Sequence, residues 1–298
     1  MNRRTSIIVP CYNSELTIKE CVCSILNSIK NTACPDKFEL IIVNEGSSDK
    51  TLKILNTING ITIVNHTKNL GLSSARNSGI KKATSDYIIF VDSDIVLTDD
   101  WIKNMLFCIQ NNKDIVGLTG SLEPAPNKKI SDLDRYLFGK YRGIKNITID
   151  TPLNYKSFVF SNTIIKKSIL NEVGVFDENI SNYGGEDTEL AIRINKKYSK
   201  KIRKLTTASA YHITQKTINQ HIDNMFEYGK YNFYKIIEKH PSYKNDLGYQ
   251  WIYTIKGNIL FNVFSRFACR AFMNLSGHPL LIKFLVIDAF VRGVKNKN

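Results

Sequence analysis

Two aspartates separated by one residue stand directly after an apolar segment. Asp92-Ser93-Asp94 follows Tyr87-Ile-Ile-Phe-Val91, which has the composition of a buried strand. Side chains two positions apart in an extended chain point the same way, so the two carboxylates would converge at the end of that strand. Unneutralised, they would repel each other and any phosphate, whereas Mg²⁺ or Mn²⁺ takes oxygen ligands and bridges carboxylates to phosphate oxygens. The pattern therefore predicts a divalent-metal site, and a capped turn without a metal is the alternative.

Two later stretches could add acid–base and metal-binding groups. Gly184-Gly185-Glu186-Asp187 precedes a predicted helix, where a carboxylate could act as a general base beside glycines that let a substrate approach closely. The same residues would also suit a flexible loop with an acidic helix cap. His212 ends the extended run 208–211, and a neutral imidazole is a common metal ligand, although a lone histidine is more often structural.

Polar residues also follow the second predicted strand. The carboxylate in Asn44-Glu45-Gly46-Ser47 could accept hydrogen bonds from a nucleobase N–H or a ribose hydroxyl, or the four residues could form an ordinary polar turn. Further along, Asn69-Leu-Gly71 supplies a glycine turn, and Ala75-Arg-Asn77 supplies a cation. Arg76 could therefore face a nucleotide or form an ion pair on the surface.

The elements that must position these groups can be read from the hydrophobic pattern. Apolar runs alternate with amphipathic stretches, and near-continuous apolar strands separated by helices predict an α/β fold whose mostly parallel sheet is covered by helices on both faces. Ligands bind beyond the carboxyl ends of the strands in such sheets. We expect strands at 6–10, 38–43, 61–64, 87–91, 115–122 and 158–160, helices at 16–29, 49–58, 73–83, 101–111, 167–173, 187–198 and 216–239, and a long polar excursion at 124–154.

The composition changes after His240-Pro241. We expect a catalytic domain over 1–240 and a C-terminal helical extension over 241–298, with aromatic helices at about 248–272 and 279–294. Phe264 and Phe267 lie on an apolar arc beside arginines, which fits packing on the rest of the chain or a homodimer contact. The alternative is an interfacial helix on an anionic membrane, and deletion of 279–298 would test it.

Charge and cysteine content limit the classes of partner. The chain of 298 residues has a formal net charge of +14, of which +10 falls in residues 201–298. Nucleic acid and anionic membranes would both attract such a segment, but no nucleic-acid-binding motif is present, so we expect no nucleic-acid partner. The six cysteines contain no C-x-x-C pair, which indicates reduced thiols rather than structural zinc. Without a signal peptide or a spanning segment in the sequence, we expect a cytoplasmic protein, or one on the cytoplasmic face of the membrane.

These segments, in this order, resemble glycosyltransferase family 2. The resemblance runs from Ser6 to about Pro241 and implies the GT-A fold, a nucleotide-sugar donor and an inverting transfer. It rests on Ser6-Ile-Ile-Val-Pro-Cys-Tyr-Asn13, Val43-Asn-Glu-Gly-Ser-Ser-Asp49, residues 69–79, Asp92-Ser-Asp94, Gly174-Val-Phe-Asp-Glu178, Gly185-Glu-Asp187 and His212.

The resemblance also implies the nucleotide-binding side of the site. Glu45 would stand where the family usually has the second of two aspartates that meet the base or ribose, and Asn44 replaces the first. This departure leaves the nucleotide open among UDP, which we favour, dTDP and GDP. The nucleotide-sugar-binding residues that we expect are Pro10, Tyr12, Asn13, Asn44, Glu45, Arg76, Asp92 and Ser93.

For catalysis, the resemblance implies a metal and a base. Asp92, Asp94 and His212 would hold Mn²⁺ or Mg²⁺ against the diphosphate, and Asp187 would be the catalytic base, with Glu186 beside it. The acceptor would be a saccharide or a lipid-linked molecule in cell-surface polysaccharide, glycolipid or glycan synthesis. Two other classes compete. A nucleotide-sugar-binding subunit without turnover would fit the Asn44-Glu45 departure, and a nucleotidyltransferase would need a glycine-rich basic loop that 11–15 lacks.

Overall fold

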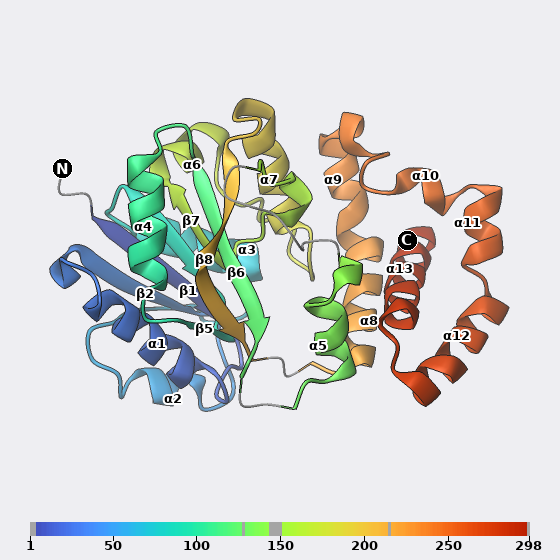
Figure 1. Ribbon diagram of the computed structural model, residues 1–298, viewed down its shortest axis with the longest axis horizontal. Helices are drawn as coiled ribbons and strands as arrows, with labels where there is room; N and C mark the ends of the chain where they lie inside the picture. The colour runs from blue at the N-terminus through green and yellow to red at the C-terminus, as the bar shows by residue number, and fades with distance from the viewer. Residues whose placement is uncertain (1–3, 127–128, 143–150, 214–215, 297–298) are drawn as a thin grey trace. The chain divides into compact units, whose positions relative to one another are not determined.

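The computed structural model describes residues 4–126, 129–142, 151–213 and 216–296 (Figure 1). The chain divides into two compact units. One, the sheet unit, comprises Met1–Asn127, Asn146–Asn179 and Glu186–Thr214. The other, the helical unit, comprises Lys128–Lys145, Ile180–Gly185 and Gln215–Asn298. The two helices that precede residue 240 pack with the C-terminal helices and belong to the helical unit. This division is by contact, and the expected functional division at residue 240 stays a prediction.

The sheet unit contains an eight-stranded mixed sheet with the order β3-β2-β1-β4-β7-β6-β8-β5. Strands β1 to β4 pair in parallel, as expected for apolar strands separated by helices. Antiparallel pairing enters where β7 lies between β4 and β6, and again where β5 pairs with β8. The strands are β1 Thr5–Cys11, β2 Phe38–Asn44, β3 Thr62–Asn65, β4 Tyr87–Val91, β5 Ile95–Leu97, β6 Gly117–Pro124, β7 Asn162–Lys166 and β8 Ile202–His212.

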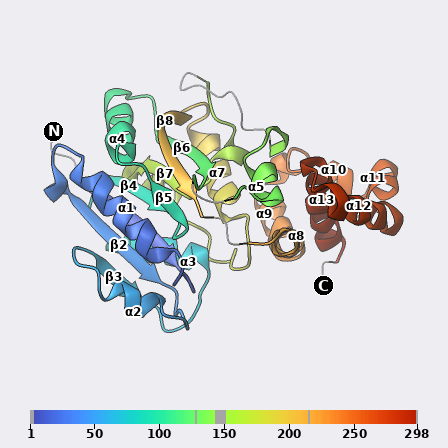
Figure 2. The ribbon, with the colours of Figure 1, turned by 60° about the horizontal axis from the view of Figure 1, so that its bottom comes forward.

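Helices cover both faces of this sheet (Figures 1 and 2), which confirms the predicted fold class. Every residue of β1 is buried, and alternate side chains serve opposite faces. Ile7 and Val9 join the core beneath α1 and α4, whereas Ile8 faces α3, where a Cβ on Gly79 would lie 2.3 Å from its Cγ2. The sheet-unit helices are α1 Ile18–Lys30, α2 Thr51–Leu55, α3 Leu72–Lys82, α4 Trp101–Asn111, α6 Lys167–Val173 and α7 Glu186–Lys197, with 3₁₀ turns η1 Pro35–Lys37 and η3 Tyr155–Ser157.

One predicted strand is wrong. Residues 158–160 do not form a strand, and the strand of this region is β7, which starts at Asn162. Phe158 and Phe160 are both buried, with ring centroids 4.9 Å apart, and Phe160 also packs edge-to-face on Phe176 at 5.0 Å. The alternating aromatic pattern therefore reflects a buried aromatic cluster rather than a pleated strand.

The helical unit is built around α13, the last helix of the chain. Its buried face, which includes Ile282, Leu285 and Ala289, packs against α5, α8, the π-helical turn η4 and α12. Glycines allow this close packing, since a Cβ on Gly293 would lie 2.1 Å from the carbonyl oxygen of Phe226. The elements of this unit are α5 Asp132–Leu137, η2 Lys140–Arg142, α8 Ile218–Glu227, η4 Tyr228–Asn232, α9 Phe233–Lys239, η5 Pro241–Tyr243, α10 Tyr249–Ile252, α11 Ile255–Leu260, α12 Val263–Ser276 and α13 Pro279–Lys295.

Two expectations change in this unit. The single helix expected at 216–239 is two α-helices joined by η4, and residue 215 lies outside the described part. The excursion at 124–154 contains α5, which Ser131 and Asp134 cap reciprocally, while 127–128 and 143–150 also lie outside the described part. None of the helices in the described ranges has both the length and the apolar composition needed to cross a bilayer.

Candidate active site

Arg76 is the centre of an ion-pair network at the carboxyl edge of the sheet. It lies on α3 with its side chain fully buried, and its guanidinium contacts three carboxylates. Its Nη2 lies 3.1 Å from Oδ1 of Asp92, and its Nη1 lies 2.7 Å from Oδ1 of Asp187 and 3.4 Å from Oε1 of Glu186. The interpretation of Arg76 as a surface ion pair is therefore wrong, and its contact with a nucleotide stays a prediction. Three expected site residues from distant parts of the sequence meet on one cation.

The segment after α6 supports this arginine. The guanidinium of Arg76 lies 5.1 Å from the centroid of the Phe176 ring, a cation–π contact. Asn77, the next residue of α3, fixes that segment, because its amide donates to the carbonyl of Phe176 at 2.9 Å and accepts from the Phe176 N–H at 3.0 Å. Its Nδ2 also donates to Oε1 of Glu178 at 2.9 Å. The motif 174–178 therefore serves to hold Arg76 in place.

One cation does not balance three carboxylates in a buried place. Burial raises the pKa of Asp187 to about 7, since removing its carboxylate from water outweighs the attraction of Arg76, and the neighbouring Glu186 and Asp92 raise it further. Burial likewise raises the pKa of Glu186 and of Asp92. The side chain of Asp187 keeps 17% of its surface exposed, and that of Asp92 keeps 31%. Asp187 is thus a partly accessible carboxylate that can accept a proton near neutral pH.

Asp94 and His212 form a second pair. Their positions follow from the antiparallel ladder, in which His212 faces Ile95, the residue after Asp94. Oδ2 of Asp94 lies 3.3 Å from Nε2 of His212, and both side chains are partly exposed. Ser93, between the aspartates, has its Oγ 2.9 Å from Oγ of Ser14. The two aspartates of the motif therefore have different partners, Arg76 for Asp92 and His212 for Asp94.

The expected metal ligands are only partly gathered. Within the described ranges, no three His, Cys, Asp or Glu side chains are grouped so that they could hold a metal ion, and Asp92 pairs with Arg76. The Asp94–His212 pair supplies an oxygen and a nitrogen donor at close range, which suits Mn²⁺ or Mg²⁺ with Asp92 nearby as a further oxygen donor. Two of the three expected ligands are therefore close together, and the metal site stays a proposal.

The expected nucleotide side begins at the loop after β1. Pro10 is buried within β1, and Tyr12 is 47% exposed. Asn13 has a left-handed backbone, with φ 47°, and clips this loop to the next one. Its N–H donates to Oγ of Ser47 at 3.0 Å, and its Oδ1 accepts from the N–H of Ser48 at 2.9 Å. Asn13 thus fixes the loop after β1 to the loop after β2. The exposed ring of Tyr12 is accessible to a planar ligand.

Asn44 and Glu45 are turned into the protein. Asn44 is 1% exposed, and its amide donates to Oδ1 of Asn65 at 2.5 Å. Glu45 is 3% exposed, and its Oε1 lies 2.7 Å from Nδ1 of His66, whose Nε2 lies 2.9 Å from Oγ of Ser78. Burial raises the pKa of Glu45, against the attraction of His66 and hydrogen bonds from the backbone of 70–71. Both residues hold the loops after β2 and β3, and their contact with a nucleotide stays a prediction.

Two residues that support the candidate site were not expected from the sequence: His66, which contacts Glu45, and Asn232, which holds the loop before Glu186. The loop 182–185 of the helical unit ends in two glycines with φ +78° and +98°, and a Cβ on Gly185 would lie 2.7 Å from Cδ1 of Ile236. Asn232, fully buried at the end of η4, donates to the carbonyls of Asn182 at 3.0 Å and Gly184 at 2.8 Å. The π-helical turn η4 directs the Asn232 side chain toward the loop 182–185. No sequence pattern predicts such a turn.

A groove lies elsewhere in the sheet unit. Residues 84–87 and 166–168 line it at the amino end of β4, the opposite end of that strand from Asp92. Its lining contains none of the expected site residues. The candidate site is therefore the open carboxyl edge of the sheet and not this groove.

A family model described as "Glycosyl transferase family 2" matches residues 6–174, and the chain belongs to this family. The expected resemblance is confirmed. The match ends before Glu186, Asp187 and His212, whose expected roles stay predictions. "Uncharacterized glycosyltransferase YfnE" of Bacillus subtilis (strain 168) is 24% identical over 241 residues, covering 64% of this chain and 60% of that protein.

A second relative is the "Poly-beta-1,6-N-acetyl-D-glucosamine synthase" of Staphylococcus epidermidis. It is 31% identical over 180 residues, covering 58% of this chain and 42% of that protein. The alignments thus span 60% and 42% of these two curated relatives.

Solved structures are similar over almost the whole chain. S. aureus TarS 1–349 in complex with UDP-GlcNAc has a TM-score of 0.61 at 19% identity, covering 98% of this chain and 90% of that one. The mannosyltransferase PcManGT from Pyrobaculum calidifontis in complex with GDP-Man and Mn²⁺ has a TM-score of 0.63 at 18% identity, covering 99% and 87%. At these identities the likeness concerns the fold, and it confirms the expected GT-A architecture.

Proposed function

We propose that this glycosyltransferase moves a sugar from a UDP-sugar to an acceptor hydroxyl with inversion, by direct displacement, in the synthesis of a cell-surface polysaccharide, glycolipid or glycan. The observation that carries the proposal is the cluster of Asp92, Glu186 and Asp187 on the buried Arg76, at the sheet edge where α/β proteins bind ligands. We assign this chemistry to the domain 1–240 and give 241–298 an accessory role.

Asp187 acts as the base in this proposal. It would take the proton of the acceptor hydroxyl as that oxygen attacks the anomeric carbon from the face opposite the diphosphate, which yields inversion without a covalent intermediate. A base works best when its pKa lies near the operating pH, and burial raises the pKa of Asp187 to about 7. Arg76 is a positioning residue, because it holds the Asp187 carboxylate at 2.7 Å.

Asp94, His212 and Asp92 would hold the divalent cation, Mn²⁺ or Mg²⁺. When bound, the cation supplies positive charge that stabilises the leaving diphosphate. Support comes from the donor set of the Asp94–His212 pair and, by analogy, from the Mn²⁺ in the complex of the structurally similar mannosyltransferase.

Similar proteins and the exposed ring of Tyr12 support UDP as the donor nucleotide. The TarS structures named above include complexes with UDP and with UDP-GlcNAc, and a curated relative is named as a poly-N-acetylglucosamine synthase. Tyr12 offers an aromatic face that is 47% exposed, on which a nucleobase could stack. GDP is the competing nucleotide, because the mannosyltransferase complex contains GDP-Man.

The first test is release of nucleoside diphosphate from a panel of UDP-, dTDP- and GDP-sugars with Mn²⁺ or Mg²⁺. We expect release from a UDP-sugar, loss of activity with EDTA, and a drop of about tenfold or more in Asp94→Ala, because charge on the leaving group would lose its counter-ion. Asp100→Ala, an exposed carboxylate near the start of α4, is the matched control. Release from a GDP-sugar alone would overturn the UDP assignment. Donor binding without any turnover would favour an inactive subunit.

A second test is the pH dependence of kcat/KM. The base must be deprotonated, so kcat/KM should fall as the pH is lowered through about 7, by about tenfold per unit below it. Burial raises this pKa most, Glu186 and Asp92 raise it further, and Arg76 lowers it. Melting temperatures measured over the same range control for unfolding. A profile that stays flat well below neutral pH in a folded enzyme would contradict Asp187 as the base.

A further inference from the structure

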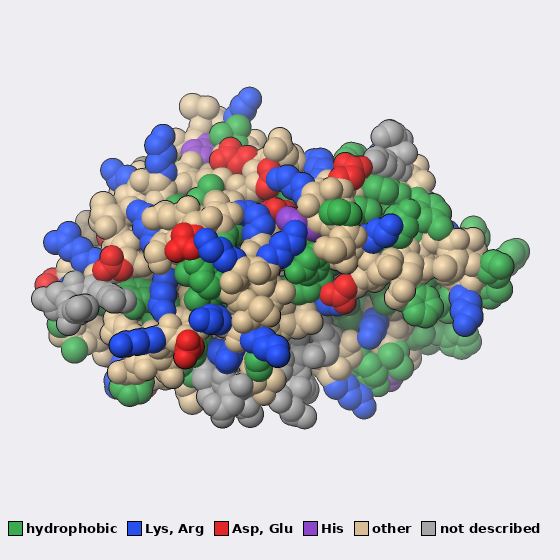
Figure 3. Space-filling model, turned by 90° about the horizontal axis from the view of Figure 1, so that it is seen from above, with side chains coloured by type: hydrophobic (Ala, Val, Ile, Leu, Met, Phe, Trp, Pro, Cys, Tyr) green, Lys and Arg blue, Asp and Glu red, His purple; other side chains and the backbone are tan. Residues whose placement is uncertain are grey.

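The outer faces of α11 and α12 carry a dense set of exposed apolar side chains. Phe264 is 86% exposed, Leu275 84% and Phe267 77%, values usual for charged rather than aromatic or aliphatic side chains. Figure 3 shows hydrophobic side chains gathered on the part of the helical unit that α11 and α12 form in Figure 1. We call this surface the apolar ridge, and it consists of Ile255, Ile259, Leu260, Val263, Phe264, Phe267, Phe272 and Leu275.

Helix α12 turns its largest apolar side chains outward. Its inward face carries Ser265 and Arg266 together with the buried Cys269, whereas its outward face carries the phenylalanines of the apolar ridge. A surface helix of a globular protein normally turns its apolar stripe to the core and its charges to water. An exposed apolar surface that spans two successive helices marks an interaction site.

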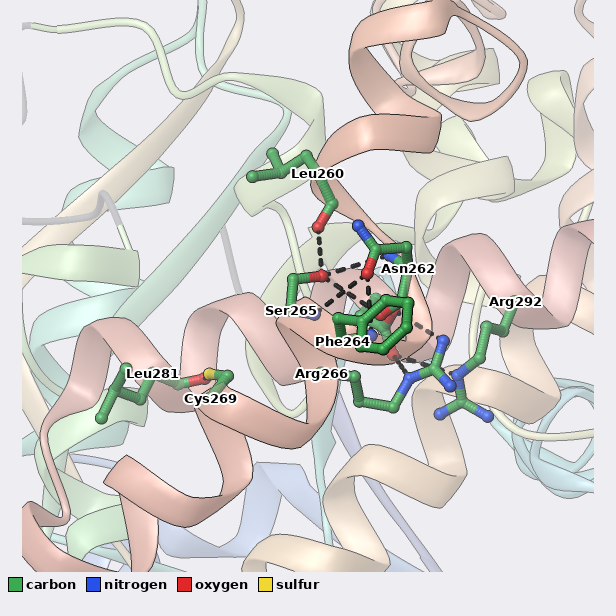
Figure 4. Close-up of polar contacts among 9 residues, drawn as sticks. Leu260, Asn262, Phe264, Ser265, Arg266, Cys269, Leu281 and Arg292 are labelled. Carbon is green, nitrogen blue, oxygen red and sulfur yellow. Dashed lines mark hydrogen bonds and ion pairs between the residues drawn. The ribbon is translucent and has the colours of Figure 1, made fainter.

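Polar contacts hold α12 in this orientation (Figure 4). Nε and Nη2 of Arg266 donate to the two carboxylate oxygens of Asp288 on α13, at 2.6 and 3.1 Å. Arg292 donates to the same carboxylate at 3.0 Å, and Sγ of Cys269 donates to the carbonyl of Leu281 at 3.4 Å. Asn262 caps the helix by accepting from the N–H of Phe264 at 2.8 Å. These polar contacts, together with the apolar packing of Cys269 and Met273, hold α12 on α13 and leave the apolar ridge outward.

The C-terminal stretch that carries the apolar ridge has a basic surface, and the nearby Asp132 of α5, which lies against Gly277 at the end of α12, is paired with Arg135. From Gly248 to Asn298 the sequence has one acidic residue, Asp288, which is fully buried and held by Arg266 and Arg292. Lys256 on α11 and Arg270 on α12 are exposed beside the ridge, and no exposed acid stands in this stretch of the described chain. Aromatic and aliphatic side chains rimmed by lysine and arginine match the interface of a bilayer that contains anionic lipids.

We propose that the apolar ridge docks on an anionic phospholipid surface as a peripheral, non-spanning contact. The phenylalanines and Leu275 would enter the boundary between headgroups and acyl chains, while Lys256 and Arg270 would meet the headgroup phosphates. A second copy of this chain fits less well, because it would oppose basic side chains with basic side chains and offer no exposed acid from α11–α13 to pair them. This proposal stands independently of the donor and of the catalytic roles.

Deletion of 279–298, the test that the sequence suggested for a membrane-binding helix, does not suit this structure. Helix α13 is the packed centre of the helical unit, with Ile282, Leu285 and Val294 buried, so its apolar residues already have partners. Deleting it would destroy the fold around it and could not report on lipid. The segment 255–275 carries the exposed apolar side chains instead.

The test is co-sedimentation of the full chain with vesicles of phosphatidylcholine alone or mixed with phosphatidylglycerol. We expect wild type to pellet with the mixed vesicles, and less so at high salt, because the anionic attraction is screened. The triple variant Phe264→Ser/Phe267→Ser/Leu275→Ser should partition at least about tenfold less, since all three side chains are exposed and their loss leaves the packing intact. Leu16→Ser/Phe107→Ser is the matched control, with side chains 75% and 71% exposed outside the ridge, and it should bind as wild type does.

Several outcomes would overturn the proposal. They are no pelleting of wild type with mixed vesicles, equal pelleting of wild type and the triple variant, or an equal loss in the control. Light scattering adds a further check: a wild-type dimer that the triple variant converts to monomer, without vesicle binding, would assign the ridge to a second copy. Nucleoside diphosphate release without an acceptor should be the same in the triple variant and wild type, so failure of the lipid proposal is distinguishable from failure of the proposed function.

Discussion

Replacing Asp187 with asparagine is expected to lower kcat by about 10²–10⁴-fold while the protein stays folded and binds its donor. The magnitude is that of a general base positioned on a hydroxyl, and asparagine keeps the shape of aspartate but cannot accept the proton. The fold should tolerate the change, because Arg76 keeps Asp92 and Glu186 as partners when Asp187 is neutral. Stopped assays of transfer or of nucleoside diphosphate release, with donor binding measured by calorimetry, check both parts.

The stability of Asp187→Asn should equal or exceed that of wild type at pH 8. The pKa of Asp187 is raised in the folded state, so the folded protein binds more protons than the unfolded chain between the two pKa values. Its ionisation therefore costs stability as the pH rises from the unfolded pKa to about 7, and the neutral amide removes that cost. A destabilised variant would mean that Asp187 serves mainly the fold.

Two comparisons make the result specific. Asp100→Asn neutralises a carboxylate that is 65% exposed and pairs with Lys103, and it should leave kcat unchanged. Glu186→Gln tests the neighbouring carboxylate, whose Oε1 lies 3.4 Å from Arg76. Wild-type turnover in Asp187→Asn together with loss of turnover in Glu186→Gln would transfer the role of base to Glu186.

The parallel strands of the sheet could be predicted because continuous apolar runs separated by helices are typical of strands buried on both faces. Every residue of β4 is buried, so both faces select apolar side chains, and the run Tyr87–Val91 has the bounds expected from sequence. The segment 158–160 was not separable from a strand, since an aromatic cluster and a pleat produce the same alternation. The sequence predicts a continuous helix across η4, because the helical period continues on either side of it.

The position of the site at the strand ends could be predicted from the sequence, but the contacts between its side chains could not. Strand ends predicted where Asp92 and Asp94 would stand. The burial of Arg76 depends on carboxylates that are 110 and 111 residues away in the chain, and α3 has no strong apolar stripe to show which side faces inward. Likewise, periodicity found the apolar arc of α12 but could not tell whether that arc faces the core or the surroundings.

Replacing Arg76 with alanine is expected to destabilise the protein by about 3–5 kcal/mol, the cost of removing one partner from a buried ion-pair network. The guanidinium is fully buried and is the cation that holds Asp92, Glu186 and Asp187, whose side chains are only 31%, 8% and 17% exposed. Water can therefore compensate little of the lost charge. Urea denaturation followed by circular dichroism measures the change. Arg135→Ala, which removes an ion pair 58% and 40% exposed, should cost less than about 1 kcal/mol.

The pH dependence of this loss separates charge from packing. Without Arg76 the pKa values of the three carboxylates rise further in the folded state, so the folded state binds protons that the unfolded chain has released. The deficit of Arg76→Ala relative to wild type should therefore be larger at pH 8 than at pH 5.5, where the carboxylates can be protonated at lower cost. A deficit that is equal at both pH values would mean that Arg76 acts by filling space against Phe176. Arg76→Lys restores one charge but not the planar fork that reaches three carboxylates, so its stability should fall between wild type and Arg76→Ala, with kcat remaining low because Asp187 loses its fixed position.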